Sequence, residues 1–316
     1  MTANYALIGA AGYIAPRHMK AIRETEGDLS VAYDVNDSVG IMDSHFPDAA
    51  FYTEFERFAE HVAGEKDKDR PVDYVGICSP NYLHKSHMAF ALRAGADAIC
   101  EKPLVLNPRD IDDLEALEAT TGQKINTILQ LRLHPAIIAL RDRIANGPSD
   151  EVYDVDLGYF TSRGDWYHAS WKSEEAKSGG IATNIGVHFY DMLSFVFGPI
   201  RENIVHHRAA DAAAGYLEFQ QARVRWVLSI NRDHLPAHTP AGQSTHRSIT
   251  VEGEEIEFSG GFTDLHTASY QNVLDGNGYG LDAVRPSIEV VSHIRTAAIE
   301  PGRGEQHPDI KKVIGA

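Results

Sequence analysis

Cysteine is scarce in this chain, and long apolar runs are missing. The 316 residues include only Cys78 and Cys100. Both lie in apolar segments, so we expect buried, reduced thiols and a cytoplasmic protein rather than a disulfide framework. No apolar run approaches the roughly 18 residues that a membrane-spanning helix needs. The first residues, MTANYALIGAAG, also lack the charged and then apolar regions of a signal peptide. We therefore expect neither standard export nor a membrane segment.

Basic residues are few relative to acidic ones. Lys and Arg total 29 against 45 Asp and Glu, which gives a formal net charge of −16. This balance argues against broad binding to nucleic acid or to an anionic membrane surface. An anionic small ligand is still compatible with it, because a local pocket of basic side chains and backbone N–H groups is enough to hold one.

Sequence motifs for metal binding are missing as well. The chain has 16 histidines, of which His84 and His87 are three residues apart and His206 and His207 are adjacent. No His-Glu-x-x-His or paired Cys-x-x-Cys spacing occurs. We expect no metal.

The order of strands and helices changes along the chain. In the first part, apolar strands alternate with amphipathic helices, which predicts an α/β fold, the doubly wound parallel sheet of a Rossmann domain. In the second part, strands follow one another without helices, which predicts an α+β domain with an open, mainly antiparallel sheet. We expect the first domain to span residues 1–128 and the second residues 129–316. The strands expected in the second domain are 152–161, 204–208, 214–219, 224–230, 248–252 and 255–258.

A glycine-containing turn joins the first expected strand to the first expected helix. Gly9 and Gly12 let the backbone approach a pyrophosphate, whose charge a helix N-terminus stabilises. The spacing is not the usual Gly-x-Gly-x-x-Gly, so a purely structural turn also fits. Asp34 follows the second strand, 22 residues after Gly12, where dinucleotide folds place the acid that binds the adenosine ribose. A carboxylate there favours NAD over NADP, although an Asp that only opens the next loop is an alternative.

Two further strand ends carry polar residues. Ser79-Pro80-Asn81 and His84 follow one buried strand, where Ser79 and Asn81 can cap the next helix while facing the same crevice. Capping alone would explain them. Glu101-Lys102-Pro103 follows the neighbouring strand, and ligands of open α/β sheets bind at such strand ends. A buried lysine there suits proton transfer, because desolvation lowers the pKa of its ammonium group. A surface lysine just past a strand is the alternative.

The segment 178–193 stands apart in the second half. Read as a regular helix, it places Asn184, His188 and Asp191 on one face. A histidine so placed can exchange a proton near neutral pH, and a neighbouring polar side chain can fix its tautomer or a substrate hydroxyl. A lone helical histidine is also commonly a satisfied, partly buried residue.

A polar and aromatic loop precedes this segment. Its side chains are suited to meet a carboxylate, a diphosphate or uracil, and a surface loop of the same composition fits equally well. Arg247-Ser248 is a second candidate for this anchoring. The candidates in the loop are Arg163, Tyr167, Ser170, Trp171 and Lys172.

Five groups of residues occur together in this sequence. They are the glycine turn with Arg17-His18, Ser79-Pro80-Asn81 with His84, Glu101-Lys102-Pro103, Ser178-Gly179-Gly180 with Asn184-x-Gly186-x-His188, and Ser269-Tyr270. On these residues, and over nearly its whole length, the chain resembles the Gfo/Idh/MocA family of nicotinamide-dependent sugar oxidoreductases.

This resemblance implies NAD as cofactor, and it implies roles for Lys102 and His188 as the catalytic pair. Lys102 would contact the nicotinamide and the substrate hydroxyl, Lys102-Pro103 would be a cis peptide, and His188 would lie across the substrate. At Asn184 the family usually has an aspartate; because an amide cannot take a proton, proton abstraction would fall on His188 or Lys102. The residues expected to bind NAD are Gly9, Gly12, Tyr13, Ile14, Asp34, Ser79, Pro80, Asn81, His84, Glu101 and Lys102.

Within the family, several stretches are most similar to the UDP-N-acetylglucosaminuronate 3-dehydrogenases of bacterial surface-polysaccharide (O-antigen) pathways. They include QLRLHP, NIGVHFYDML and THRSITVEGEEIEFSGGFTDLH. This implies a UDP-sugar uronate substrate oxidised at C3. The residues expected to bind it are Asn184 together with Arg163, Tyr167 and Lys172 of the polar and aromatic loop. It also implies reoxidation of NADH by a 2-oxo acid such as 2-oxoglutarate, and a homotetramer joined through the second-domain sheets. Two alternatives are a dehydrogenase of a free polyol or simple sugar, and a non-catalytic NAD-binding sensor.

Overall fold

The computed structural model describes residues 2–66, 70–240, 242–256 and 264–315. Its chain divides into two compact units. Unit 1 comprises Met1–Gln130 and Thr263–Arg285, and unit 2 comprises Leu131–Phe262 and Pro286–Ala316. The first cut falls close to the expected boundary at residue 128. Thr263–Arg285 was expected in the second domain, but it belongs to unit 1. The reason is that a helix of this segment, Leu265–Leu274 (α9), packs on helix Ala15–Glu24 (α1).

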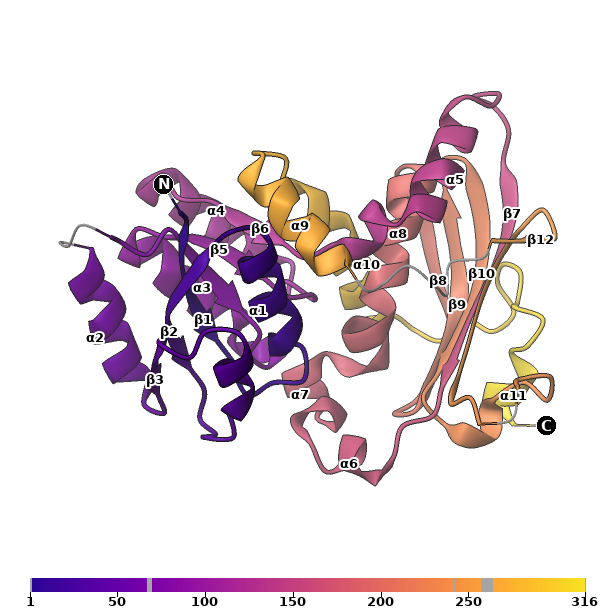
Figure 1. Cartoon of the computed structure of the whole chain (residues 1–316). Coiled ribbons are helices and arrows are strands. Elements are labelled where there is room, and N and C mark those ends of the chain that lie inside the picture. Colours follow the sequence, from indigo (N-terminus) through magenta and orange to yellow (C-terminus); the bar gives the residue numbers. More distant parts are fainter. Residues whose placement is uncertain (1, 67–69, 241, 257–263, 316) are drawn as a thin grey trace. The chain divides into compact units, whose positions relative to one another are not determined.

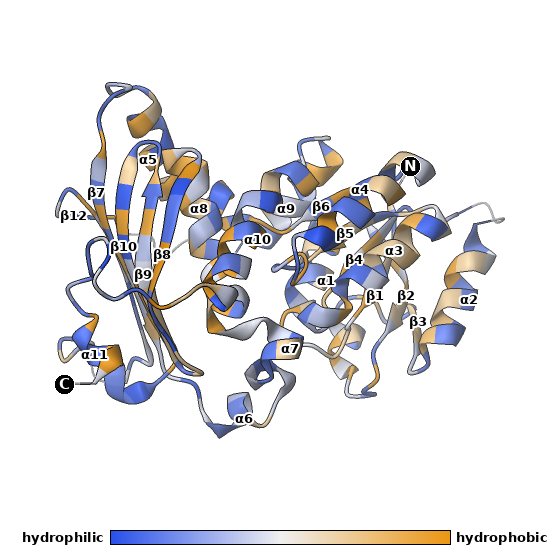
Figure 2. Cartoon of the chain, turned by 180° about the vertical axis from the view of Figure 1, so that it is seen from behind, coloured by the Kyte–Doolittle hydropathy of each residue, from blue (hydrophilic) through white to orange (hydrophobic). Residues whose placement is uncertain are grey.

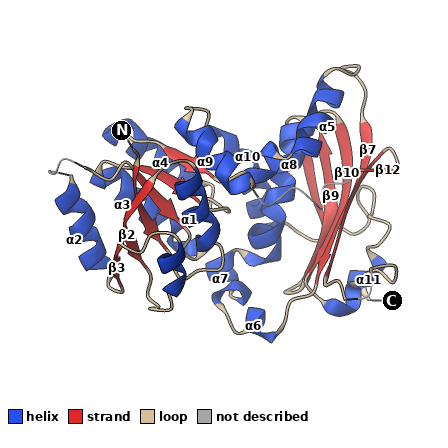
Figure 3. Cartoon of the chain, in the orientation of Figure 1, coloured by secondary structure: helices blue, strands red, loops and turns tan. Residues whose placement is uncertain are grey.

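Unit 1 is the expected Rossmann fold. Its six strands pair in parallel in the order β3-β2-β1-β4-β5-β6, with helices on both faces (Figures 1 and 3). The strands are Asn4–Ile8 (β1), Asp28–Tyr33 (β2), Ala50–Tyr52 (β3), Tyr74–Ile77 (β4), Asp97–Cys100 (β5) and Ile125–Thr127 (β6). The helices besides α1 and α9 are Phe55–Glu65 (α2), His84–Ala94 (α3) and Arg109–Thr121 (α4).

The core of unit 1 explains why α9 belongs to it. Tyr5 and Leu7 are alternate residues of β1, so their side chains point to the same face of the sheet. On that face they pack in one cluster with Met19 and Ile22 of α1. Tyr270 of α9 is fully buried in the same cluster. Burial of a tyrosine of this size contributes on the order of 2 kcal/mol, so α9 is an integral part of this unit.

Unit 2 contains a second six-stranded sheet, in the order β12-β11-β7-β10-β9-β8. All its neighbours are antiparallel except β7 and β10, which pair in parallel, so the expectation of a mainly antiparallel sheet is confirmed. The strands are Tyr153–Thr161 (β7), Ile200–Arg208 (β8), Ala212–Phe219 (β9), Ala222–Ser229 (β10), Thr245–Val251 (β11) and Glu254–Glu255 (β12). The strand expected at 255–258 is thus represented by Glu254–Glu255, and residues 257 and 258 lie outside the described residues.

Helix Val187–Phe197 (α8) packs on one face of this sheet. Trp226 of β10 packs edge-on against Tyr190 of α8, and Tyr159 of β7 packs against Phe189. The first halves of β7 and β10 alternate between apolar and polar residues (Figure 2). The helices are Pro135–Ala145 (α5), Asp165–His168 (α6), Glu175–Ser178 (α7), Val187–Phe197 (α8) and Lys311–Ile314 (α11), while helix Leu281–Thr296 (α10) carries the division between the units at Arg285 and Pro286.

The other face of the sheet is neither bare nor purely apolar. Arg225 of β10 forms two hydrogen bonds with the Asp156 carboxylate of β7, at 2.6 and 2.9 Å, and also contacts Glu305. Ile310 and Val313, near the end of the chain, pack against apolar residues on the same face. The chain's own C-terminal segment therefore covers part of the surface for which a partner subunit was expected. No helix in the described part of the chain is long and apolar enough to span a membrane.

Candidate functional site

The carboxyl ends of β1, β4 and β5 bring three expected motifs to one edge of the unit 1 sheet. Gly9 follows β1 with φ of +88°, a conformation that favours glycine. A Cβ at this position would lie 2.7 Å from the carbonyl carbon of Cys78, at the end of β4. The Glu101 N–H, at the end of β5, donates to Ile77 O at 3.0 Å. The prediction that these strand ends meet is confirmed, because their strands are neighbours in the sheet.

The glycine turn is closed by backbone hydrogen bonds and by Asp34. Gly9 N–H donates to Tyr33 O at 2.8 Å, and Gly12 N–H donates to Gly9 O at 3.0 Å. The Asp34 carboxylate accepts from Ala11 N–H at 3.0 Å and from Asn36 N–H at 2.9 Å. Asp34 is thus both the loop-forming residue and the link between the ends of β1 and β2. Tyr13 and Ile14 lie in the same turn, and Tyr13 is 91% exposed.

This turn fits a dinucleotide on the evidence of its backbone. At the start of α1, Ala15 N–H donates to Gly12 O at 3.1 Å, Pro16 has no N–H, and Arg17 N–H donates to Ile14 O at 3.0 Å. The fit to a dinucleotide therefore rests on the glycine conformation, which keeps side chains away from the turn. A side chain at Gly9 would occupy the space between the ends of β1 and β4. The residues of unit 1 are therefore compatible with NAD binding at this edge.

The expected capping by Ser79 and Asn81 is wrong. The short turn Asn81–Leu83 and α3 begin after Pro80 and Leu83, and neither start has a side-chain cap. Instead, Ser79 Oγ lies 2.8 Å from His87 Nδ1. Burial lowers the pKa of His87 to about 4, so its ring is neutral near pH 7.

His84 joins the loop after β4 to the loop after β5. Its Nδ1 lies 2.8 Å from Pro103 O, and its Nε2 lies 2.8 Å from Ser79 O. The ring is 1% exposed, and burial lowers its pKa. The peptide between Lys102 and Pro103 is cis, as the family resemblance implied. Lys102 itself is partly exposed, whereas its neighbours Glu101 and Pro103 are buried.

Glu101 is buried in a cluster that sequence reasoning did not find. Its Oε1 accepts hydrogen bonds from His18 Nε2 at 3.0 Å and His266 Nε2 at 2.9 Å. Although burial by itself raises the pKa of this carboxyl, the hydrogen bonds from the two histidines hold that pKa well below its usual range. The three residues are separated by 83 and 165 positions, so no local pattern could have brought them together.

In unit 2, two expected substrate-binding residues touch each other. Asn184 Nδ2 donates to the Tyr167 hydroxyl at 3.2 Å. Asn184 lies in a π-helical turn, Ala182–Gly186, which precedes α8. The expectation of one regular helix through 178–193 is therefore wrong, and the wider turn changes the spacing on which the shared face of Asn184 and His188 was based. Such π turns are frequent at functional sites.

Asp191 does not belong to the polar face on which it was expected. It is 2% exposed, and its carboxylate accepts two hydrogen bonds from Arg132, at 2.9 and 2.6 Å. Burial raises the pKa of Asp191, and the contact with Arg132 opposes that rise. The Arg132 guanidinium also lies over the Phe195 ring, 5.1 Å from its centroid. This buried pair fixes α8, which carries His188, to the segment before α5.

The remaining loop candidates are held less firmly. Lys172 Nζ lies 4.1 Å from the centroid of the Trp171 ring, and Ser170 Oγ bonds to Tyr167 O at 2.9 Å. Arg163 is partly exposed, and its charge acts on Tyr167. Arg247 lies over the Tyr159 ring on β7.

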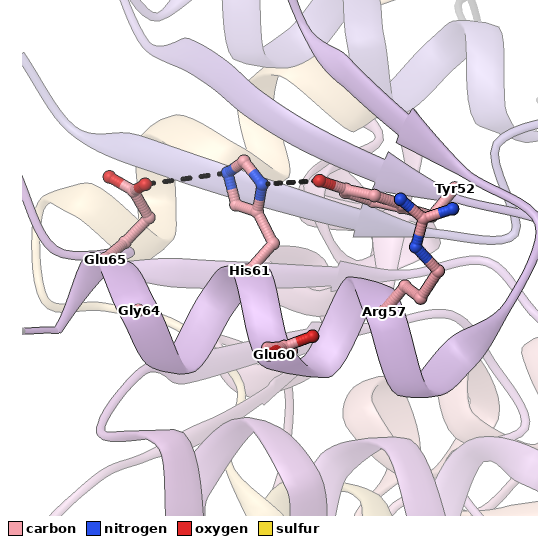
Figure 4. A pocket seen from close by; sticks show the side chains of 6 residues that line it. All are labelled: Tyr52, Arg57, Glu60, His61, Gly64 and Glu65. Carbon is pink, nitrogen blue, oxygen red and sulfur yellow. Dashed lines mark hydrogen bonds and ion pairs between the residues drawn. The ribbon is translucent and has the colours of Figure 1, made fainter.

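A surface pocket lies away from these motifs, on α2 and the edge strand β3. It has a volume of about 270 Å³ and is lined by Tyr52, Arg57, Glu60, His61, Gly64 and Glu65 (Figure 4). His61 bridges the Tyr52 hydroxyl, at 3.1 Å, and Glu65. This pocket contains none of the expected site residues.

Fold and site together define a dinucleotide-binding oxidoreductase. Residues 3–128 match the model of the oxidoreductase family with NAD-binding Rossmann fold, and residues 141–236 match the family's C-terminal alpha/beta domain. The chain belongs to the Gfo/Idh/MocA family of oxidoreductases.

Two solved structures and one characterised relative are similar to this chain. The WlbA (WbpB) dehydrogenase from Thermus thermophilus in complex with NAD and α-ketoglutarate is 49% identical, with a TM-score of 0.94 over 98% of this chain and 99% of that chain. The same dehydrogenase in complex with NAD and UDP-GlcNAcA is 48% identical, with a TM-score of 0.93 and the same coverage. The D-glucoside 3-dehydrogenase of Escherichia coli is 28% identical over 276 residues, which cover 77% of this chain and 76% of that protein.

Proposed function

We propose that this protein oxidises the C3 hydroxyl of UDP-N-acetylglucosaminuronate to the 3-keto sugar, with NAD⁺ as the hydride acceptor. The observation that carries the proposal is the 48% identity, over 98% of the chain, to a dehydrogenase crystallised with NAD and this nucleotide sugar. The D-glucoside relative, whose name also specifies position 3 of a sugar ring, supports the choice of hydroxyl.

The chain's own residues supply binding and proton transfer. The bound cofactor takes the hydride from C3, and the hydroxyl proton must go to a side chain. We assign this step to Lys102 and His188, the two titratable groups that the family resemblance places at the reacting carbon. Asn184 orients the sugar ring, and Arg163, Tyr167 and Lys172 hold the uronate or diphosphate. The turn from Gly9 to Ile14, with Asp34, holds the dinucleotide, while Ser79, Pro80, Asn81, His84 and Glu101 form the rest of its site.

The second half of the cycle regenerates the oxidised cofactor. We propose that 2-oxoglutarate accepts the hydride and a proton and leaves as the 2-hydroxy acid, which supports repeated turnover without release of the cofactor. The basis is the complex of the Thermus dehydrogenase with NAD and α-ketoglutarate. We further propose a cytoplasmic homotetramer that serves the synthesis of O-antigen sugars.

Mixing the purified protein with UDP-N-acetylglucosaminuronate and NAD⁺, with and without 2-oxoglutarate, tests both halves. A product lighter by two hydrogens that forms only with the uronate supports the dehydrogenase, and formation of 2-hydroxyglutarate supports recycling. No product with the uronate, but turnover of free polyols or simple sugars, would assign the protein to that substrate class instead. NAD binding without turnover of either substrate class would favour a sensor.

A further inference from the structure

A buried hydrogen-bond network ends at the backbone of Lys102. Oε1 of Glu101 accepts from His18 and His266, as described above. Oε2 of the same carboxylate accepts from the N–H of Lys102 at 3.2 Å. On the far side of His18, Nδ1 lies 2.8 Å from the Tyr270 hydroxyl. None of the four residues Glu101, His18, His266 and Tyr270 is more than 6% exposed.

The hydrogen-bond partners indicate where the protons of Glu101, His18 and Tyr270 lie. An ionised carboxylate only accepts, so His18 and His266 each carry a proton on Nε2. The free lone pair of a neutral His18 is then on Nδ1, where it accepts the Tyr270 O–H. Burial lowers the pKa of His18, against the opposing effect of Glu101, which agrees with a neutral ring. Within this network Glu101 is therefore ionised and His18 is neutral.

The same three side chains have the donor types of a metal site. Ligand atoms of His18, Glu101 and His266 lie within 4.8 Å of one another. However, both Nε2 atoms are directed at one oxygen, at 3.0 and 2.9 Å, which are ordinary hydrogen-bond lengths. Both Nε2 atoms and Glu101 Oε1 are thereby engaged in hydrogen bonds, and we interpret the cluster as a hydrogen-bond network.

We propose that His18, His266 and Tyr270 are positioning residues for Lys102. This inference rests on the proposed function, in which Lys102 acts on the substrate hydroxyl. The carboxylate that they hold fixes the N–H of Lys102, and His84 holds the carbonyl of the next residue, Pro103. The backbone on both sides of the Lys102 side chain is thus attached to buried groups. The placement of a catalytic group strongly affects the reaction rate, since a displacement of about 1 Å can lower the rate roughly a hundredfold.

The network also explains why α9 returns to unit 1. It contributes His266 and Tyr270, which lie 165 and 252 positions from Glu101 and His18, respectively. Apolar packing of α9 requires only large apolar side chains. The hydrogen bonds of His266 and Tyr270, by contrast, fix the position of α9 at the strand end that precedes Lys102.

The test compares variants that remove or retain one hydrogen bond. His266→Leu and Tyr270→Phe remove a donor, whereas His266→Gln keeps an N–H donor. Tyr5→Phe is the matched control, because it removes a phenol from the same core, 5.8 Å from the Tyr270 ring, without touching Glu101. For each protein, kcat and KM with UDP-N-acetylglucosaminuronate and the Kd for NAD⁺ are measured. The rate at which an amine-specific reagent labels Lys102, followed by peptide mass spectrometry across pH, gives a readout independent of turnover.

We expect His266→Leu to lower kcat roughly ten- to hundredfold and Tyr270→Phe by less, with KM and the Kd for NAD⁺ within about twofold of wild type. The pH profile of Lys102 labelling should shift in both, and His266→Gln should recover most of the loss. Unchanged kcat and labelling in His266→Leu and Tyr270→Phe would overturn the inference, as would equal losses in the Gln and Leu variants. Stoichiometric zinc in the purified protein would also overturn it, in favour of a metal site. If wild type fails to oxidise the nucleotide sugar, the proposed function fails, and the labelling profiles alone decide the inference.

Discussion

The Asn184 amide donates to the Tyr167 hydroxyl at 3.2 Å, and this contact joins the π turn before α8 to the loop that follows β7. Tyr167 is 3% exposed, and burial raises the pKa of its phenol, so it stays protonated at neutral pH. Its hydroxyl therefore has a proton to donate while its lone pair holds Asn184. In the proposed site, this pair fixes the amide that orients the sugar ring.

Removing that hydroxyl should weaken substrate binding. A typical hydrogen bond contributes about 0.5–1.5 kcal/mol, so we expect Tyr167→Phe to raise KM for UDP-N-acetylglucosaminuronate by roughly two- to tenfold. The Kd for NAD⁺, measured by titration, should not change. Trp166→Phe is the control, because Trp166 is 57% exposed beside it. An unchanged KM in Tyr167→Phe would remove this pair from the substrate site.

Lys102→Ala tests the proposed proton acceptor. A positioned acid–base group contributes about 10²- to 10⁴-fold, so turnover should fall by that factor while NAD⁺ binding is retained. Steady-state rates and a cofactor titration on the same preparation separate the two effects. Lys85→Ala is a suitable control, because Lys85 pairs with Asp110 on the surface. Near wild-type turnover in Lys102→Ala would show that another residue takes the proton.

The features that could be predicted from the sequence are those that depend on local residue patterns and on the order of the strands. Alternation of strands and helices was sufficient for the parallel sheet, and neighbouring strands then had to bring Gly9, Ser79 and Lys102 to one edge. The regular helical spacing assigned to Asn184, His188 and Asp191 was wrong, because hydropathy does not distinguish a π turn from an α-helix.

The contacts that sequence did not reveal are those between distant segments. His18 was noted only as part of the glycine-turn motif, and His266 has no local signature, since each is a single histidine on its helix. The ion pair of Arg132 with Asp191 spans 59 positions. Such pairs are determined by tertiary packing, which a single sequence does not encode in any short motif.

Gly9→Ala should distort the turn after β1 and thereby weaken both the fold and the dinucleotide site. The new methyl group would lie 2.7 Å from the backbone of Cys78, at a φ of +88° that alanine rarely adopts. We expect a loss of about 1–3 kcal/mol in the free energy of unfolding and weaker NAD⁺ binding. Gly122→Ala is the matched control, because Gly122 has φ of +79° with nothing within 4 Å of its Cβ position. Equal effects of the two variants on NAD⁺ affinity would mean that the close approach at Gly9 is unimportant.

Buried neutral histidines should make the protein sensitive to mild acid. The pKa of His87 falls from 6.5 to about 4 on folding, so the unfolded chain binds a proton at higher pH than the folded one. Stability is then fully present above pH 6.5 and decreases as the pH falls toward 4, by about 3 kcal/mol for this group. His87→Phe, which preserves stacking on Phe55, should reduce the pH dependence of chemical denaturation over this range. If the pH dependence is the same in both proteins, His87 is not held neutral by the fold.

The buried pair of Arg132 and Asp191 should be costly to break but not to replace. Arg132→Ala leaves a carboxylate that is 2% exposed without its partner, which typically costs about 3–5 kcal/mol. Because burial raises the pKa of Asp191, the orphaned carboxyl should bind a proton more readily in the folded variant than in the unfolded chain. The difference in unfolding free energy from wild type should therefore be smaller at pH 4 than at pH 7. The double variant Arg132→Met, Asp191→Leu should recover most of the loss, because two apolar side chains need no desolvation of charge. A double variant as unstable as Arg132→Ala would show that the hydrogen bonds themselves, rather than the cost of the unpaired charge, hold α8 in place.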